Sequence, residues 1–213
     1  MIKLIFFDMD GVLTVEKSSW FYVNNRLGIN NRENYKKYMN GELLYHDFFK
    51  LDLSQWIKKY PDIRGETIRN ILDEIKPVDG LGTIMNYLKN HGILSVIVSG
   101  GISWLSDRIV RDYGINEAYA NRISCDGNGI IIPDGVIQVD PMKKDLVMKD
   151  VISSHGIRPE ECLAVGDSES DYSMFRAVPN FIAFNSDSEL LLKISKINLK
   201  NDLTGIIDYI KSY

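Results

Sequence analysis

The chain has 213 residues, of which 45% are hydrophobic and 25% are charged. These proportions are ordinary for a globular protein, so they exclude general disorder and suit one core domain with a modest insertion. The formal net charge is only −4, which provides no sequence-wide attraction to nucleic acid or to acidic membranes. We therefore expect no nucleic-acid or membrane partner, although a local site can still bind a small anion.

The cysteines and the first residues bear on the cellular compartment. Cys125 and Cys162 lie far apart and form no CxxC pair, so neither a disulfide framework nor a zinc site is indicated. The apolar segment 1–7 is interrupted by Asp8 and Asp10, which makes it too short for a membrane span and unlike a signal peptide. We expect a cytoplasmic location, and no pattern indicates an oligomeric state.

Short apolar runs that end in polar loops predict buried parallel strands. They cover residues 2–7, 94–98, 162–165 and, more weakly, 181–184. Hydrophobic residues at helical spacing, each set followed by a glycine, predict helices over 81–88, 105–113 and 147–152. This alternation predicts an α/β fold with a doubly wound, Rossmann-like parallel sheet, which binds ligands at the carboxyl ends of its strands.

Two segments depart from this alternation. Residues 15–76 are rich in Tyr, Asn, Lys and Trp at helical spacing and contain no convincing strand, so we predict a small helical cap inserted into a core of residues 1–14 and 77–213. Residues 127–139 combine the turn sequences Gly127-Asn128-Gly129 and Pro133-Asp134-Gly135 with short apolar runs, which is typical of a hairpin.

The first predicted strand ends at two carboxylates. Asp8 and Asp10 are two residues apart, and Gly11 gives the chain freedom to turn directly after them. Hydrolysis of a phosphate ester needs a nucleophile and a proton donor, which two acids can supply. Taken alone, the pair is as well or better explained as a solvated loop, because Asp and Gly are common turn residues.

The next two strand ends add further polar groups. Ser99-Gly100-Gly101 can present a hydroxyl and backbone N–H groups to a phosphate at the start of a helix near Ser103, or can form a tight turn with a serine cap. Gly166-Asp167-Ser168-Glu169-Ser170-Asp171 places three acids in five positions. Such acids suit Mg²⁺, although an acidic helix start has the same composition.

Together with Lys144, these motifs resemble those of the haloacid dehalogenase superfamily of phosphatases, in the same order and strand context. The likeness is strongest to the phosphoserine phosphatase branch. It is carried by segments 8–14, 96–101, 120–122 and 164–167, and covers most of residues 1–14 and 77–185.

This resemblance implies a magnesium-dependent phosphatase acting on a small phosphorylated metabolite. Asp8 would be the nucleophile that becomes phosphorylated, and Asp10 the general acid and then the general base. Lys144 would neutralise Asp8 and the phosphoryl group, with Lys143 as the alternative if the register is shifted by one.

The resemblance also implies the phosphate and metal ligands. Ser99 and the Gly100 N–H would bind phosphate oxygens, as would Lys144. Mg²⁺ would be held by Asp8, the backbone carbonyl of Asp10, Asp167 and, directly or through water, Asp171.

The chain departs from the phosphoserine phosphatase branch at three points. Ser170 replaces the asparagine that precedes the last aspartate of the metal loop. Lys17 replaces the glutamate that reads the substrate amine, although Glu16 is adjacent. The position of the arginine that binds the substrate carboxylate is occupied by Trp56 when counted back from Pro77, and by Asp52 when counted forward from Gly41. We therefore expect a small phosphomonoester other than free phosphoserine, unless Glu16 and one of three other cap arginines, Arg26, Arg32 and Arg64, take over.

Other functions stay open on the sequence alone. A phosphotransferase or mutase would pass the phosphoryl group to a second substrate, and a silent phosphate-binding protein would lack turnover altogether. The latter is disfavoured because all four carboxylates are present, and a dehalogenase is disfavoured because it needs neither Asp10 nor the magnesium loop.

The predicted cap also carries a group of aromatic residues. These either line a substrate pocket or form the core of the small helical cap, which is the commoner role of such residues. The residues are Trp20, Phe21, Tyr22, Tyr35 and Tyr38.

Overall fold

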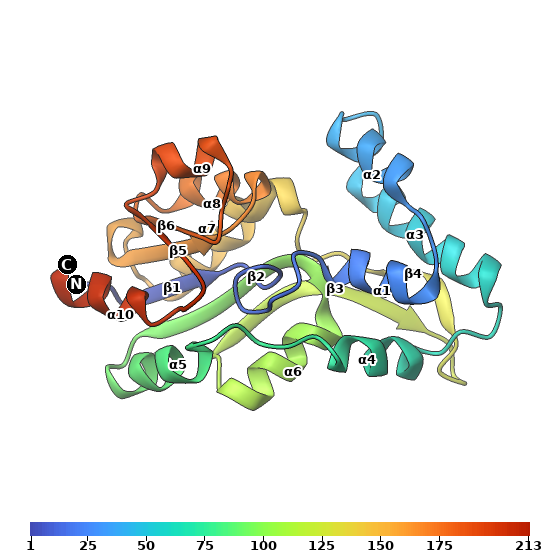
Figure 1. The fold of residues 1–213 in the computed structure, drawn as a ribbon, viewed down its shortest axis with the longest axis horizontal. Coiled ribbons are helices and arrows are strands. Elements are labelled where there is room, and N and C mark those ends of the chain that lie inside the picture. The colour runs from blue at the N-terminus through green and yellow to red at the C-terminus, as the bar shows by residue number, and fades with distance from the viewer.

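A seven-stranded sheet forms the centre of the protein, and the computed structural model describes all 213 residues (Figure 1). The strands lie in the order β4-β3-β2-β1-β5-β6-β7, and every neighbouring pair is parallel except β3 and β4. Their bounds are β1 Leu4–Phe7, β2 Leu94–Ile102, β3 Glu117–Cys125, β4 Ile131–Val136, β5 Cys162–Gly166, β6 Phe181–Phe184 and β7 Ile197–Leu199. The predicted α/β fold with a doubly wound parallel sheet is confirmed.

Ten α-helices surround this sheet. Six belong to its two faces: α5 Leu81–Asn90, α6 Ser103–Tyr113, α7 Lys144–Ser154, α8 Tyr172–Ala177, α9 Glu189–Ile194 and α10 Gly205–Ser212. The other four come between β1 and α5 in the chain: α1 Ser19–Leu27, α2 Arg32–Met39, α3 Tyr45–Lys59 and α4 Gly65–Asp73. No helix is both long enough and apolar enough to span a membrane. The cytoplasmic location stays a prediction.

The alternation of side chains along β1 explains the two covered faces. Leu4 and Phe6 pack in one apolar cluster with α7, α8 and α9, whereas Ile5 and Phe7 pack in another with α5, α6 and α10. Figure 1 shows these two groups of helices on opposite sides of the strands. All four side chains are fully buried, and burial of each stabilises the fold by about 1.5–3 kcal/mol. A strand that is apolar on both faces can only be central.

The register of the central strands brings the three polar motifs to one edge. Phe7 at the end of β1 is paired with Ile97 in β2 and with Val165 in β5. Asp8, Ser99 and Asp167 come one or two residues after these three positions and therefore lie at the same level along the sheet. This placement agrees with the rule that ligands bind at the carboxyl ends of parallel strands.

Residues 15–76 contain helices and no strand of the sheet. The chain enters this segment at Thr14 and leaves it at Pro77, and these two residues form an isolated antiparallel bridge. Side chains of α1 and α3, such as Val23 and Trp56, belong to the same apolar cluster as Ile5 of the sheet. The helical segment is thus packed directly on the core.

The structure differs from the sequence prediction in three places. β2 does not end at Val98 but continues to Ile102, so the Ser99-Gly100-Gly101 motif is extended backbone that leads straight into α6. β3 and β7 were not predicted. The hairpin joins β3 to β4 through a turn at 126–130, where the Asp126 carboxylate accepts the N–H groups of Asn128 and Ile130. Pro133-Asp134-Gly135 lies inside β4, on its exposed edge.

Candidate active site

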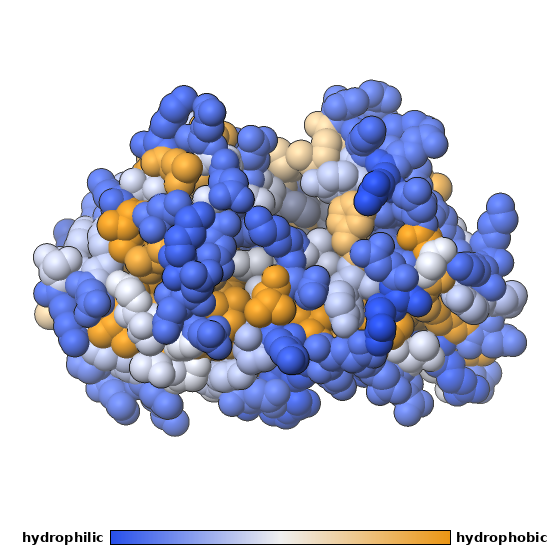
Figure 2. Space-filling model, in the orientation of Figure 1, coloured by the Kyte–Doolittle hydropathy of each residue, from blue (hydrophilic) through white to orange (hydrophobic).

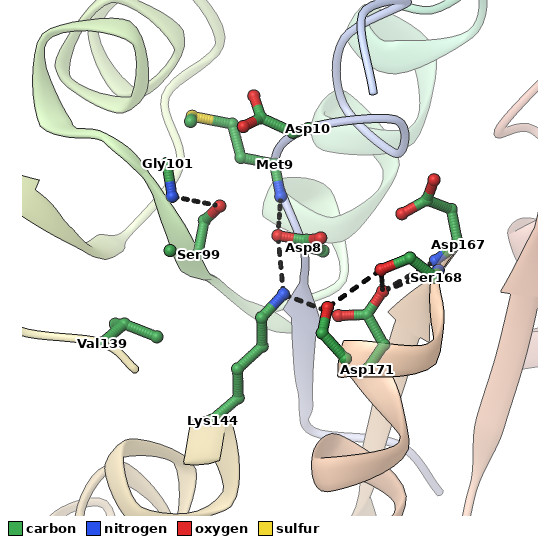
Figure 3. A network of polar contacts seen from close by, with 12 residues as sticks. Asp8, Met9, Asp10, Ser99, Gly101, Val139, Lys144, Asp167, Ser168 and Asp171 are labelled. Atoms are coloured by element: carbon green, nitrogen blue, oxygen red, sulfur yellow. Dashed lines mark hydrogen bonds and ion pairs between the residues drawn. The ribbon is translucent and has the colours of Figure 1, made fainter. Parts of the chain in front are cut away.

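A buried lysine links two carboxylates at the centre of the site (Figure 3). Asp8 follows β1, and its Oδ1 accepts the Met9 N–H at 2.7 Å and pairs with Lys144 Nζ at 2.8 Å. Lys144 begins α7, and its Nζ also lies 2.6 Å from Asp171 Oδ1. All three side chains are buried. The ammonium group of Lys144 therefore neutralises Asp8 from one side and fixes its orientation.

The structure decides between the two adjacent lysines. Lys144 is 1% exposed, whereas the Lys143 side chain is 62% exposed and pairs with Asp140 at 3.5 Å. Burial opposes the charged form of Lys144, but the Asp171 and Asp8 carboxylates outweigh it and raise the lysine pKa above its ordinary value. Lys144 thus stays charged, and Lys143 does not reach the site.

Three buried carboxylates gather around this lysine. Oxygen atoms of Asp8, Asp167 and Asp171 all lie within 4.8 Å of one another. Burial first, and then the negative charges of Asp171 and Asp8, raise the pKa of Asp167 to about 8. The pKa of Asp8 rises to about 6 mainly through burial, against the pull of Lys144. One lysine does not balance three carboxylates, so the cluster suits a divalent cation.

The donor set fits Mg²⁺, which prefers carboxylate, carbonyl and water oxygens. Asp171 Oδ1 already contacts Lys144, and its Oδ2 accepts the N–H groups of Asp167 and Ser168 at 2.9 and 3.0 Å. Asp171 therefore shapes the loop and offers a cation only its remaining lone pairs or a bridging water. The backbone carbonyl of Asp10 accepts no hydrogen bond from the protein.

Gly11 makes room for the metal loop. Its φ of +77° lies in the left-handed region, which disfavours other residues. A Cβ at this position would also collide with the carboxylate of Asp167. The glycine that follows the two acids of the first motif is therefore needed for Asp167 to approach Asp8.

Asp10 is held by Ser19, the first residue of α1. Its Oδ2 accepts both the backbone N–H of Ser19 at 2.8 Å and the Ser19 hydroxyl at 2.7 Å. Its Oδ1 is buried and has no hydrogen-bond partner. Burial raises the pKa of Asp10 to about 7, with a smaller contribution from Asp8 and an opposing one from Ser19. Near neutral pH the carboxyl group can hold a proton, and Oδ1 is the oxygen free to carry it.

The Ser99-Gly100-Gly101 motif is anchored by three donors to the Gly100 carbonyl. The Gly100 carbonyl accepts hydrogen bonds from Trp20 Nε1 at 3.0 Å, from the Tyr45 hydroxyl at 2.9 Å and from Asn121 Nδ2 at 3.0 Å. Ser99 Oγ accepts the Gly101 N–H at 3.1 Å, which leaves the hydroxyl proton free to point at a phosphate oxygen. Two of the anchoring donors come from the helical segment, so the motif depends on that segment being in place.

A cavity of about 420 Å³ opens onto these groups. Figure 2 shows the surface hollowed between the lobe of α8 and α9 and the helices α2 and α3. The sequence-predicted residues that line the cavity are Asp8, Asp10, Ser99, Gly100 and Lys144. Asp167 and Asp171 do not line it and lie in the carboxylate cluster beside Asp8. Every predicted site residue is thus near the same edge of the sheet.

Sequence reasoning missed three residues of this site. Ser19 binds Asp10, Tyr45 binds the Gly100 carbonyl, and the buried Asn121 binds the same carbonyl. Asn121 also accepts the N–H groups of Gln138 and Val139, so it ties β3 to the chain that leads to Lys144. Asn121 lies in a segment that resembles the phosphatase branch, which was the one available signal.

Comparison with known proteins agrees with this geometry. A family model described as haloacid dehalogenase-like hydrolase matches residues 2–178. A phosphoserine phosphatase of Methanocaldococcus jannaschii is 29% identical over 218 residues, covering 98% of each chain. A phosphoserine phosphatase of Archaeoglobus fulgidus is 28% identical over 98% of this chain and 60% of its own length.

Solved structures show the same likeness. A phosphoserine phosphatase described as a phospho-aspartyl intermediate analogue superposes with a TM-score of 0.81, at 26% identity over 98% of both chains. A substrate-bound phosphoserine phosphatase complex gives a TM-score of 0.82 at the same identity and coverage. The chain therefore belongs to the haloacid dehalogenase-like hydrolase family, as a phosphoric monoester hydrolase.

Proposed function

We propose that this protein hydrolyses a small phosphomonoester, with Mg²⁺, through a phosphoryl intermediate on Asp8. The proposal rests on two nearby carboxyl groups in different states. The charge of one is neutralised, and the other can hold a proton. Asp8 is held by the buried Lys144, while Asp10, two residues later, keeps Oδ1 free of hydrogen bonds. A similar solved protein is described as an analogue of a phospho-aspartyl intermediate, which supports the assignment.

In the first half of the reaction, a carboxylate oxygen of Asp8 attacks phosphorus in line with the leaving oxygen. The P–O bond to the leaving group breaks, and its electron pair stays on the leaving oxygen. Asp10 donates its proton to that oxygen, so an alcohol departs and an acyl phosphate forms on Asp8. Lys144 offsets the charge that the phosphoryl group adds next to Asp8, and Ser99 and the Gly100 N–H hold phosphoryl oxygens.

In the second half, the Asp10 carboxylate takes a proton from water, and the water oxygen attacks phosphorus. The bond between phosphorus and Asp8 breaks, which releases inorganic phosphate and restores the carboxylate. Mg²⁺, held by Asp8, Asp167 and the Asp10 carbonyl with Asp171 beside them, would supply positive charge for the phosphoryl oxygens.

We further propose that residues 15–76 act as a specificity cap on a core of residues 1–14 and 77–213. Cap residues form much of the cavity wall, from Glu16 to Phe48. The relatives named above are phosphoserine phosphatases, whereas none of the three cap arginines considered for this chain lines the cavity. Arg26 pairs with Glu74, Arg64 donates to the Asn128 carbonyl, and Arg32 is exposed on α2. A phosphomonoester other than phosphoserine is therefore favoured.

The first test is hydrolysis of p-nitrophenyl phosphate with and without Mg²⁺, followed by trapping of the adduct with a phosphate-mimicking fluoride complex. The expected result is metal-dependent turnover and an adduct on Asp8. An adduct on another residue would refute the nucleophile. Release of nitrophenol that requires an added alcohol acceptor, with no matching release of inorganic phosphate, would instead indicate a phosphotransferase.

A further inference from the structure

The cap presents a continuous aromatic wall to the cavity. We use this name for Phe21, Tyr35, Tyr38, Tyr45 and Phe48, all of which line the cavity. Neighbouring rings in the wall are in contact, with centroids 5.5 Å apart for Phe21 and Tyr35, 5.4 Å for Tyr38 and Phe48, and 5.3 Å for Tyr38 and Tyr45. The sequence left open whether Trp20, Phe21, Tyr22, Tyr35 and Tyr38 line a pocket or form the core of the cap. All five line the cavity, and Tyr38 is also buried.

Two hydroxyl groups of the wall are already committed to the core. The Tyr38 hydroxyl donates to Asp140 at 2.8 Å, and the Tyr45 hydroxyl donates to the Gly100 carbonyl. The rings of these two tyrosines, rather than their hydroxyl groups, are therefore available to contact a ligand. A ligand beside them meets flat apolar surface, which favours aromatic or extended apolar groups.

Exposed apolar side chains gather at the same cavity. Tyr35 and Met39 of α2 are 38% and 41% exposed, and Met142, which precedes α7, is 40% exposed. The cap and the core thus each leave an apolar group uncovered at the cavity. Exposed apolar groups clustered in a hollow mark a binding site, and methionine adapts its shape to the ligand.

The cavity lacks the arginine that would bind the carboxylate of an amino acid, although Glu16, which could meet the amine, does line it. The two residues at the arginine position are buried inside the cap: Trp56 donates to Asn24, and Asp52 accepts from Asn31. Neither lines the cavity, and no arginine does. The cavity cations are Lys144, which is paired with carboxylates, and the exposed Lys17, whose charge acts on Asp167.

We infer that the physiological substrate is a phosphomonoester whose leaving group carries an aromatic or extended apolar portion, which packs between the aromatic wall and Met142. This inference rests on the proposed phosphatase activity and adds the substrate class. The cavity volume of about 420 Å³ agrees with it, because pockets of about 300–1,000 Å³ bury ligands much larger than serine.

The test compares kcat/KM for four alkyl phosphates: benzyl, 2-phenylethyl and ethyl phosphate, and phosphoserine. None of the four has an activated leaving group, so differences report mainly how the leaving group is bound. We expect the two aromatic substrates to exceed both ethyl phosphate and phosphoserine by about tenfold or more, the size of effect that a few apolar groups produce in a fitted pocket. A lead for phosphoserine or ethyl phosphate would overturn the inference.

A pair of matched variants tests the wall itself. Tyr35→Ala removes a half-exposed ring of the wall, and Tyr60→Ala removes a ring that is 41% exposed on the same cap but outside the cavity. The benzyl-to-ethyl ratio of kcat/KM should fall at least threefold in Tyr35→Ala and stay unchanged in Tyr60→Ala. Because the ratio is taken within one preparation, partial unfolding cancels. An unchanged ratio in Tyr35→Ala would contradict the role of the wall.

Failure of the proposed function would look different. If the wild-type protein with Mg²⁺ hydrolyses neither this panel nor p-nitrophenyl phosphate, the phosphatase assignment falls and the substrate class with it. If it hydrolyses the panel with phosphoserine first, the phosphatase assignment stands and only the substrate class is wrong.

Discussion

Ser19→Ala probes the link between the cap and the proposed general acid. The Ser19 hydroxyl is one of two donors to Asp10 Oδ2, and the variant keeps the other donor, the backbone N–H. Because Oδ2 already accepts two hydrogen bonds, the proton of Asp10 resides on Oδ1, which has no hydrogen-bond partner. Loss of the hydroxyl lets the proton sit on either oxygen and lets the carboxyl group rotate. We therefore expect proton donation to the leaving group to weaken.

The size of the effect follows from the hydrogen bond that is removed. Asp10 becomes a carboxylate as it gives up its proton, and a hydrogen bond to such a charged group contributes about 1.5–3 kcal/mol. About 1.4 kcal/mol corresponds to a factor of ten in rate. Hydrolysis of an alkyl phosphate should thus slow by about 10- to 100-fold. A nitrophenyl leaving group departs without needing the proton, so its hydrolysis should change by less than about threefold.

The assay is a series of phosphate esters whose leaving groups differ in basicity, with kcat measured for each. In Ser19→Ala the dependence of kcat on leaving-group basicity should become steeper than in the wild type. Ser18→Ala is the matched control, because Ser18 caps the same helix by accepting the Phe21 N–H and does not contact Asp10. Equal losses on all esters, or the same steepening in Ser18→Ala, would refute the positioning role and indicate a shift of the whole helix.

Three further predictions concern the core and the cap. Asp8→Asn should abolish turnover, and Asp10→Asn should slow alkyl phosphate hydrolysis by about 10²- to 10⁴-fold, as measured by phosphate release; a near-normal rate in either variant would overturn its assigned role. Chelation should remove activity and added Mg²⁺ should restore it, whereas full activity after rigorous metal removal would contradict the cofactor. Asp52→Asn should raise the free energy of unfolding at about pH 8 and leave it nearly unchanged at about pH 4.

The positions of Asp8, Ser99 and Asp167 were predictable because each depends on a short stretch of the sequence. Asp8, Ser99 and Asp167 each follow an apolar run that can only be a buried strand, and parallel strands end at one edge. The choice between Lys143 and Lys144 was not local. It depends on where the short turn at 141–143 gives way to α7, and this sets which side chain points at Asp8.

The contacts between cap and core were not predictable from spacing. Ser19 and Tyr45 lie in helices whose hydrophobic pattern describes how each helix packs, but not which core atom faces its polar residues. Gly101 shows how narrow that fit is, since a Cβ there would come within 2.8 Å of both Asp10 Oδ2 and Ser19 Oγ. This contact forms only where three segments of the chain meet, so the sequence of any one segment does not predict it.

Asp52 is one of the two residues at which the sequence resemblance implies a substrate-binding arginine. It is 1% exposed in α3, and burial raises its pKa from 3.8 to about 7 although Asn31 and Asn24 donate to its carboxylate. The residue therefore belongs to the cap interior and titrates there, rather than at the substrate.

The sign of the effect follows from the pKa being higher in the folded state. The folded protein holds the Asp52 proton between about pH 4 and pH 7, where the unfolded chain loses it, so stability from this group is complete below about pH 4 and declines as the pH rises through 7. The difference between 3.8 and about 7 corresponds to at most about 4 kcal/mol. Asparagine has nearly the same shape and no charge, so Asp52→Asn should recover part of this energy at about pH 8. Urea unfolding of both proteins across this range measures it, and a difference that does not change with pH would show that Asp52 does not titrate in the folded cap.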